Sequence, residues 1–500
     1  MRIFPGHRML ASTAGLALLC GPALADVTAQ DVWTNWQAYM KEAGYDLTAS
    51  EEAGSGVLVV KDVEMRMAMP EDDGQTSLTM RELSFVENGD GTVSVSVSNN
   101  LPISFAFDDG DEDVAATLVM SHQGLTTVAS GSPEEIVYTY GAVNIALTLQ
   151  DLMVDGMQVD DLDGEVAVAN LAGTQHVSIG ENFFSKDAIT AEKLSIMVKG
   201  IDPDSGGNID LTMALVGLQG RSEGTLPFGS FAGSPSAMFG EDLSLLSSYT
   251  MQSAALAAAF EDEDGPGQIN LTTGAGASDI EMNDELMSYS GEIADIETTV
   301  MAPDVPLPID VSFGELGYDL NVPLKASEEA QDFGLSLKFN DISLSDFLWN
   351  MFDPGAVLPR DAASLLVDLS GRATLFEDLV SLDEDISDIP GEVNAVSIDA
   401  LMLSAAGADI SGTGSFTFDN SDMVSFDGFP RPEGAVDLKI NGINGLLDSL
   451  VTMGLLPAEQ AMPVRMMLGM FTVPQGEDQL TSRIEVNDQG HVLANGQRLK

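Results

Sequence analysis

Apolar and polar residues alternate along many short stretches of this chain. Residues 92–98 alternate strictly between threonine or serine and valine. The other clear apolar sets are Val63, Met65, Met67 and Met69 in one stretch, and Leu335, Leu337 and Phe339 in another. A period of two with one apolar side is typical of antiparallel strands that are covered on one face. We therefore predict a mainly β protein, a meander of long antiparallel sheets.

Turn-forming residues separate these stretches. Residues 88–91, 155–156 and 488–490 combine Asn or Asp with Gly, which is typical of tight hairpin turns. Many of the acidic residues therefore belong to turns or to outward positions of strands.

A few segments have helical spacing instead. Thr28 and Asp31 are placed to form a capping box before an amphipathic helix that carries Trp33 and Trp36 and ends at Gly44. We predict that this helix covers the end of a sheet. Further short helices are expected near residues 236–248, 345–352, 444–453 and 457–471. Residues 251–260 are rich in alanine, but their setting between turns favours a strand.

The N-terminus has the pattern of an export signal. Basic residues precede an apolar run from Met9 to Leu19, and Ala25 ends a small-residue cleavage motif. Cys20 is the sole cysteine, so cleavage after Ala25 leaves a mature chain without disulfides or thiolate sites. We predict a periplasmic protein with no transmembrane segment in the mature chain.

The length of the chain indicates more than one compact core. We predict a signal peptide at residues 1–25, an N-terminal helix with an antiparallel β region at residues 26–230, and a second β-rich region at residues 231–500. A loop rich in Gly, Ser and Pro suggests the boundary between the two regions. The sequence leaves the oligomeric state open.

The chain is strongly acidic, with 79 acidic residues against 20 basic ones and a net charge of −59, yet 44% of it is hydrophobic. Nucleic acid and anionic lipid surfaces would repel such a chain, so we expect neither as a partner. The apolar content is enough for a folded protein if charge and apolar residues lie on opposite faces of regular elements.

The chain offers little recognisable catalytic chemistry. Residues 220–224 fit the G-x-S-x-G pattern around Ser222, but Pro227 follows closely, where a nucleophile elbow needs a helix. Thiolate and histidine metal sites lack ligands, and the phosphate-binding loop G-x-x-x-x-G-K is absent. We predict no cofactor and no enzymatic activity. The best calcium candidate is Asp202, Asp204 and Asp210, although a methionine stands where the bidentate glutamate belongs.

The C-terminal third resembles a known family. The stretches that carry the resemblance are residues 335–344, 348–354, 358–361, 367–371, 476–480, 484–486 and 490–496, together with residues 31–39 near the start. They are similar to an uncharacterised secreted family of mainly alphaproteobacterial proteins, domain of unknown function 2125. That resemblance implies no role for any residue. A looser similarity to AsmA-like envelope proteins implies long curved sheets with an apolar inner face.

Two functions are open at this point. The first is a non-enzymatic periplasmic binding or carrier module that holds lipid or another apolar ligand along a hydrophobic sheet face, with Val63, Met65, Met67, Met69, Leu335, Leu337 and Phe339 as candidate groove residues. The second is a structural or interaction protein of the cell envelope with packed sheets and an acidic surface that calcium stabilises. An open apolar groove would favour the first, and a filled core would favour the second.

Overall fold

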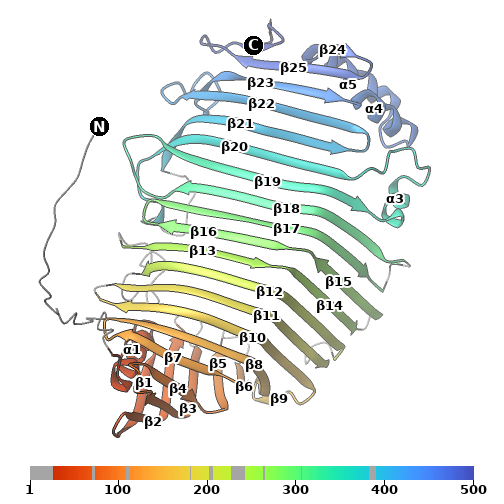
Figure 1. Ribbon diagram of the computed structural model, residues 1–500. Coiled ribbons are helices and arrows are strands. Elements are labelled where there is room, and N and C mark those ends of the chain that lie inside the picture. Colours follow the sequence, from red (N-terminus) through yellow and green to blue (C-terminus); the bar gives the residue numbers. More distant parts are fainter. Residues whose placement is uncertain are drawn as a thin grey trace, which may run out of the picture.

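Antiparallel β-structure dominates the protein, as the alternation predicts. A computed structural model describes residues 26–69, 74–108, 113–180, 182–201, 206–226, 242–262, 265–303, 305, 307–381 and 390–500. The signal-like segment 1–25 lies outside these residues. The described strands form one sheet of 27 strands, in which every pairing between neighbouring strands is antiparallel (Figure 1).

The N-terminal region contains helix α1 and strands β1–β12. Their bounds are α1 (Ala29–Glu42), β1 (Asp46–Ala53), β2 (Val57–Met69), β3 (Gly74–Glu87), β4 (Val93–Val97), β5 (Asn100–Asp108), β6 (Asp113–Gln123), β7 (Thr126–Ser132), β8 (Glu135–Val154), β9 (Met157–Gln158), β10 (Leu162–Ile179), β11 (Phe183–Ile201) and β12 (Asn208–Leu226).

The remaining described elements continue the same sheet. They are β13 (Ser244–Met251), β14 (Ser253–Asp262), β15 (Gly265–Thr273), β16 (Gly276–Asn283), β17 (Leu286–Met301), β18 (Ile309–Pro323), β19 (Gln331–Leu344), α3 (Asp346–Phe352), β20 (Ala363–Leu375), a 3-10 turn (Leu379–Ser381), β21 (Gly391–Ala405), β22 (Ala408–Asp419), β23 (Arg431–Asn441), α4 (Ile443–Thr452), α5 (Ala458–Phe471), β24 (Val473–Gly476), β25 (Gln479–Val486), β26 (Val492–Ala494) and β27 (Gln497–Arg498).

One helix prediction is wrong. Residues 236–241 lie outside the described part of the chain, but residues 244–248 belong to strand β13 rather than to a helix near 236–248. Both edges of β13 are hydrogen-bonded, to β12 on one side and to β16 on the other. These pairings override the local preference of a leucine-rich segment for helix. Helices α3, α4 and α5 lie where helices were predicted, and residues 253–262 form strand β14.

The sheet is not a simple meander, because it forks in two places. The first half of β3 pairs with β5 and its second half with β4, while β8 rejoins the two branches through β6 and β7. The same arrangement recurs at β12, whose halves pair with β14 and β13, and at β17, which pairs with β15 and β16. The second fork connects the two sides of the expected boundary near residue 230, so both regions share one sheet.

Residues with left-handed backbone lie in a line across the sheet, at the level where the forks divide, and we call this line the crease. Asn170, Asp295 and Asp341 have left-handed backbone in mid-strand, as does Gly217. Side-chain contacts link these positions from strand to strand: Asn170 donates a hydrogen bond to Glu192, and Gly314 lies against Asp341. Because Asn, Asp and Gly tolerate this conformation, the long strands can bend here (Figure 1).

Side-chain alternation slips by one residue at the crease. In β2, Leu58 and Val60 precede the left-handed Asp62, and Val63 and Met65 follow it. All four apolar side chains are nevertheless buried in the same core. The slip therefore keeps the apolar residues on one face along the whole length of a bent strand.

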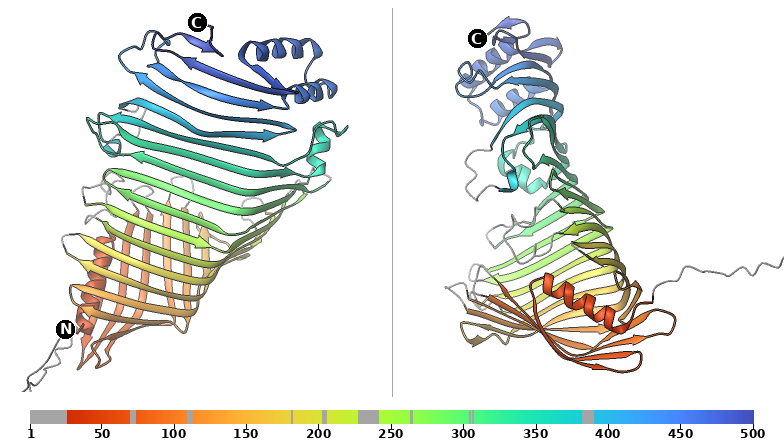
Figure 2. Two further views of the ribbon diagram at one scale, coloured as in Figure 1. Left: turned by 45° about the horizontal axis from the view of Figure 1, so that its top comes forward. Right: turned by 90° about the vertical axis from the view of Figure 1, so that its left-hand side faces the viewer.

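The main core lies at the N-terminal end, beneath α1. Thr28 and Asp31 form the predicted capping box, and Trp33 and Trp36 pack their rings on Phe85 at centroid distances of 5.9 and 5.6 Å. Figure 2 shows the N-terminal strands turning beneath the rest of the sheet, with α1 inside the bend. The helix covers one end of the sheet, as predicted.

Candidate functional site

The side of the sheet that carries α1, which we call the inner face, is mostly apolar, although polar residues such as Asp187 and Ser222 interrupt it near α1. Directly opposed residues of an antiparallel pair point to the same face, so the register traces that face from strand to strand. Starting at Val177, which is buried with α1, the opposed residues are Ser185, Gly224, Leu245, Met282, Met287 and Val322.

Beyond that point the inner face is almost wholly apolar. From β18 to β23 it carries Leu316, Tyr318, Leu320, Val322, Phe333, Leu335, Leu337, Phe339, Leu365, Val367, Leu369, Val396, Ile398, Leu401, Phe416, Val436 and Leu438. On the other side of the crease, positions such as Ile196, Leu211 and Ile269 continue the apolar pattern.

The opposite side of the sheet, the outer face, carries the charge. Glu315 and Lys338 form an ion pair of 2.5 Å there, and Asp437 and Arg483 form another of 2.5 Å. Ser336 lies between Asp319 and Asp368 on neighbouring strands. From β18 to β25, the charged residues of the strands thus lie on the outer face and most of the apolar ones on the inner face.

The inner face is closed at one end and open over most of its length. Under α1, Val60, Val63 and Phe85 are completely buried. From β18 to β22, by contrast, Leu335, Leu369 and their described neighbours on the inner face are only half-buried, and Tyr318 is exposed. From β18 to β22 the described inner face is therefore a partly exposed apolar surface rather than a filled core, and we call this surface the trough.

Aromatic rings lie flat on the floor of this trough. A Cβ atom built on Gly291 would meet the ring of the opposed Tyr318 at 2.9 Å, so that ring lies directly over the glycine. The same cross-strand arrangement pairs Tyr140 with Gly173, Tyr249 with Gly220, Phe260 with Gly267, and Phe333 with Gly371. A flat ring over a glycine covers the backbone without rising into the trough, which leaves room for a ligand.

The closed end contains the few polar groups of the inner face near α1. Tyr138 donates a hydrogen bond of 2.8 Å to Asn35 on α1, and a gap of 280 Å³ remains beside them. Burial, together with the negative charge of Asp187, raises the pKa of Tyr39 and of Tyr140. Both phenols therefore stay neutral hydrogen-bond donors at ordinary pH.

The predicted groove residues fall into two different environments. Val63 and Met65 are buried in the closed core, Met67 is half-buried, and the side chain of Met69 lies outside the described part. Leu335, Leu337 and Phe339 lie in the open trough. Alternation identified the correct face in both stretches, but it could not show which part α1 covers.

The sequence search missed most of the trough. Its aliphatic and aromatic residues belong to strands whose alternation shifts at the crease, so no single period of two marks them. The glycine–aromatic pairs join residues that the register alone brings together. One signal of the shift was present in the sequence. An Asn or Asp stands before Leu or Ile in the middle of several strands, at Asn170, Asp295 and Asp341, and marks where the alternation shifts.

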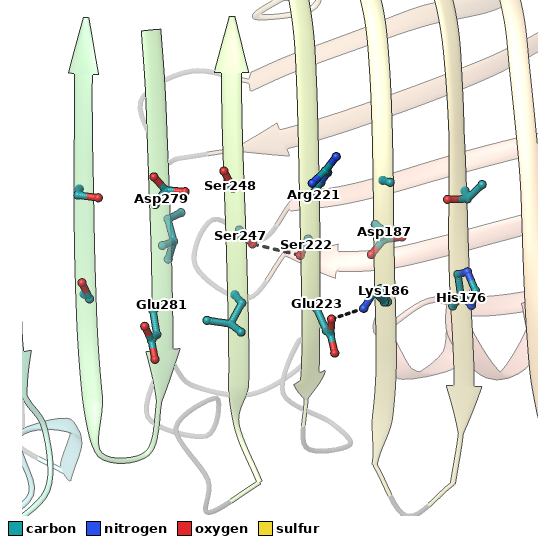
Figure 3. Close-up of a pocket in the computed structure, with 16 residues that line it drawn as sticks. His176, Lys186, Asp187, Arg221, Ser222, Glu223, Ser247, Ser248, Asp279 and Glu281 are labelled. Atoms are coloured by element: carbon teal, nitrogen blue, oxygen red, sulfur yellow. Dashed lines mark hydrogen bonds and ion pairs between the residues drawn. The ribbon is translucent and has the colours of Figure 1, made fainter.

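A second feature is a hollow of 690 Å³ along β10–β17, most of whose side chains belong to the outer face. Figure 3 shows Lys186 in an ion pair of 2.6 Å with Glu223, and Arg221 and Asp279 nearby. Ser222 lies inside strand β12, and its hydroxyl accepts a hydrogen bond from Ser247. That setting lacks the turn of a nucleophile elbow, because residues 223–226 continue the strand.

The calcium candidate is only partly described. Asp202 and Asp204 lie outside the described residues, and Asp210 forms an ion pair of 2.9 Å with Lys199. Within the described ranges there is no group of three or more His, Cys, Asp or Glu side chains placed to hold a metal ion. In the same part of the chain, no helix is long and apolar enough to cross a membrane.

Comparisons with known proteins add a family. Residues 250–496 match the model of domain of unknown function 2125, described as an uncharacterized protein conserved in bacteria, which confirms the resemblance seen in the sequence. No curated protein matches the chain. Among solved structures, BauA, the ferric preacinetobactin receptor from Acinetobacter baumannii, is similar at 8% identity over 90% of this chain and 78% of that chain, with a TM-score of 0.17, too low to bear on fold or function. The likeness to AsmA-like proteins stays a prediction. Residues 250–496, nearly half of the chain, are thus similar to the bacterial family of domain of unknown function 2125.

Proposed function

We propose that this is a non-enzymatic protein of the periplasm that binds an apolar ligand, such as the acyl chains of a lipid, along the inner face of its sheet. The observation that carries the proposal is the open apolar trough of β18–β23, where Leu335, Leu337 and their neighbours are only half-buried. Large exposed apolar surfaces are rare on proteins that have no ligand or partner for them.

The chemistry of the trough favours an apolar ligand over a polar one. The opposed positions Leu320, Leu335 and Leu369 present hydrocarbon only, and polar side chains of the same strands point to the outer face. A hydrocarbon chain that lies along the trough gains the free energy of apolar burial without stranding a buried polar group.

The second function considered, a packed structural protein of the envelope, would need a filled inner face. The described trough residues do not pack against a second layer in the way that Val60 and Phe85 do under α1. Calcium stabilisation remains open to a direct measurement, because a bound ion raises the melting temperature. An unchanged melting temperature with calcium and with a chelator would count against it.

The test compares matched lysine substitutions on the two faces of β19. Leu335→Lys places a charge in the trough, whereas Ser336→Lys places the same charge on the outer face between Asp319 and Asp368. Native mass spectrometry of protein extracted gently from cell envelopes should find bound lipid on the wild type and on S336K. The bound fraction should fall at least about tenfold on L335K, because a buried unpaired charge costs several kcal/mol.

Two results would contradict this proposal. One is wild-type protein that is recovered without any bound lipid. The other is an L335K variant that keeps as much lipid as S336K while its circular dichroism and melting temperature show a folded protein.

A further inference from the structure

Helix α5 has an exposed methionine stripe that the proposed function does not use. Met462, Met466 and Met470 follow each other at intervals of four residues, so they lie on one side of the helix. Their exposed fractions are 75%, 67% and 58%. Ala461, on the other side of the helix, is buried, so the stripe points away from the protein.

The charge around α5 differs from that of the rest of the chain. Residues 449–475 contain one acidic residue, Glu459, and one basic residue, Arg465, in a protein with a net charge of −59. Arg465 is paired with Asp448 at 2.5 Å. The helix is therefore an apolar pole without net charge on an otherwise strongly acidic molecule.

The stripe lies at the end of the sheet opposite α1. Ser482 points to the inner face, since it is opposed to Leu438, and its hydroxyl donates a hydrogen bond of 2.6 Å to the carbonyl oxygen of Phe471, the last residue of α5. Figures 1 and 2 show α4 and α5 grouped at the C-terminal end of the sheet. The helix thus joins the sheet on the side where the trough opens.

We propose that α5 docks the protein on the surface of a lipid bilayer, with Met462, Met466 and Met470 buried at the boundary between headgroups and acyl chains. The stripe is a convex ridge of long, unbranched side chains, which suits a soft layer better than a rigid groove on a partner protein. The acidic remainder of the molecule is repelled by the negative surface of a membrane, so contact is confined to this neutral pole. The proposal goes beyond ligand binding and does not require that the trough be loaded.

Flotation of the mature protein with vesicles tests the proposal. Vesicles of phosphatidylcholine alone, and vesicles with added phosphatidylglycerol, are mixed with the wild type and with the triple variant M462D/M466D/M470D. The matched control is Met157→Asp, because Met157 on β9 has an exposed fraction of 68% far from α5 in the chain. A second variant, M462L/M466L/M470L, keeps the apolar stripe without its methionines.

The wild type, M157D and the leucine variant should float with phosphatidylcholine vesicles, and the triple aspartate variant should lose at least about tenfold in partitioning. Added phosphatidylglycerol should weaken binding, and salt should restore it. All variants should keep the wild-type melting temperature, because the substituted side chains are exposed.

Two flotation results would overturn the proposal: wild-type protein that does not float, or a triple aspartate variant that floats as well as M157D. A third contrary result is a stripe that joins two copies of the protein. Light scattering would then show a lipid-independent dimer that the aspartate variant abolishes. A failure of the proposed lipid binding in the trough would be a separate result. L335K should remove the bound lipid that mass spectrometry detects, but it should leave flotation unchanged.

Discussion

At the scale of single residues, the left-handed positions of the crease set the face on which β2, β10, β12, β17 and β19 present their apolar side chains. A strand that bent without this slip of one residue would turn its apolar side from the inner to the outer face. The crease positions in β10, β17 and β19 are Asn170, Asp295 and Asp341, residue types whose short polar side chains tolerate a positive φ.

Asp295 provides the clearest test of that role. Its φ is 50°, and its carboxylate lies beside Gly274, between β15 and β16. Asp295→Val should lower the free energy of unfolding by about 1–2 kcal/mol, because a β-branched residue is strained in the left-handed region. Asp295→Asn removes the same charge but keeps the conformation, so its melting temperature should stay close to that of the wild type.

Thermal unfolding followed by circular dichroism measures both variants. Equal melting temperatures for D295V and D295N would show that the crease does not depend on the left-handed backbone at this residue.

At the scale of elements, a helix end that has no cap from its own residues can be capped by a side chain that is distant in the sequence. Helix α4 begins at Gly442, which has no side chain to cap it. Asp478, in the turn between β24 and β25, instead accepts hydrogen bonds from the backbone N–H groups of Asn444 and Gly445 at 3.0 and 2.9 Å. A cap supplied from so far along the chain leaves no local motif in the sequence.

Helix α3 is held by a buried carboxylate at its C-terminal end. Asp353 accepts hydrogen bonds from the N–H groups of Val357 and Leu358 at 3.0 and 2.9 Å. These bonds, with the nearby Arg360, hold the pKa of Asp353 below its ordinary value. The ionised form therefore stabilises the folded state above the ordinary pKa of about 4, and that stability is lost as the pH falls through the lower folded-state pKa.

The change Asp353→Asn should destabilise this region at neutral pH and should remove that part of its pH dependence. Hydrogen exchange of the Val357 and Leu358 amides, measured between about pH 3 and 7 after correction for intrinsic exchange, reports both effects. Wild type and D353N should differ most at neutral pH and converge as the pH falls. A difference that stayed constant across this range would rule out ionisation of Asp353 as the cause.

The elements that sequence could predict are those whose signal is local. Alternation identified the strand around Leu335, and the capping box located α1. The helix expected near residues 236–248 failed because β13 is fixed by its two neighbours, which the segment itself does not encode. Val63 was expected in an open groove for a similar reason: its alternation is that of a trough strand, and only the docking of α1 buries it.

At the scale of the whole molecule, the sheet is less compact and exposes more surface than an ordinary globular fold. The accessible surface is 29639 Å² for a chain of 52.7 kDa, whereas a compact monomer of that mass exposes about 18,000 Å². The two forks extend the sheet further, and they depend on pairings between strands distant in sequence.

This architecture predicts a gradient of stability along the sheet. The amides of β2 and β3 lie beneath α1, where Val60 and Leu83 are completely buried. The amides of β20 and β21 lie in a single layer whose inner face is only half-buried, so local opening there exposes less additional apolar surface and costs less free energy.

In hydrogen exchange monitored by mass spectrometry, peptides from β2 and β3 should exchange at least about tenfold more slowly than those from β20 and β21, since a difference of about 1.4 kcal/mol in opening free energy already gives that ratio. Lipid that fills the trough should slow the exchange of β20 and β21 selectively. Uniform protection in the lipid-free protein would mean that a covering layer closes the trough, and the apolar inner face would then be core rather than a binding surface.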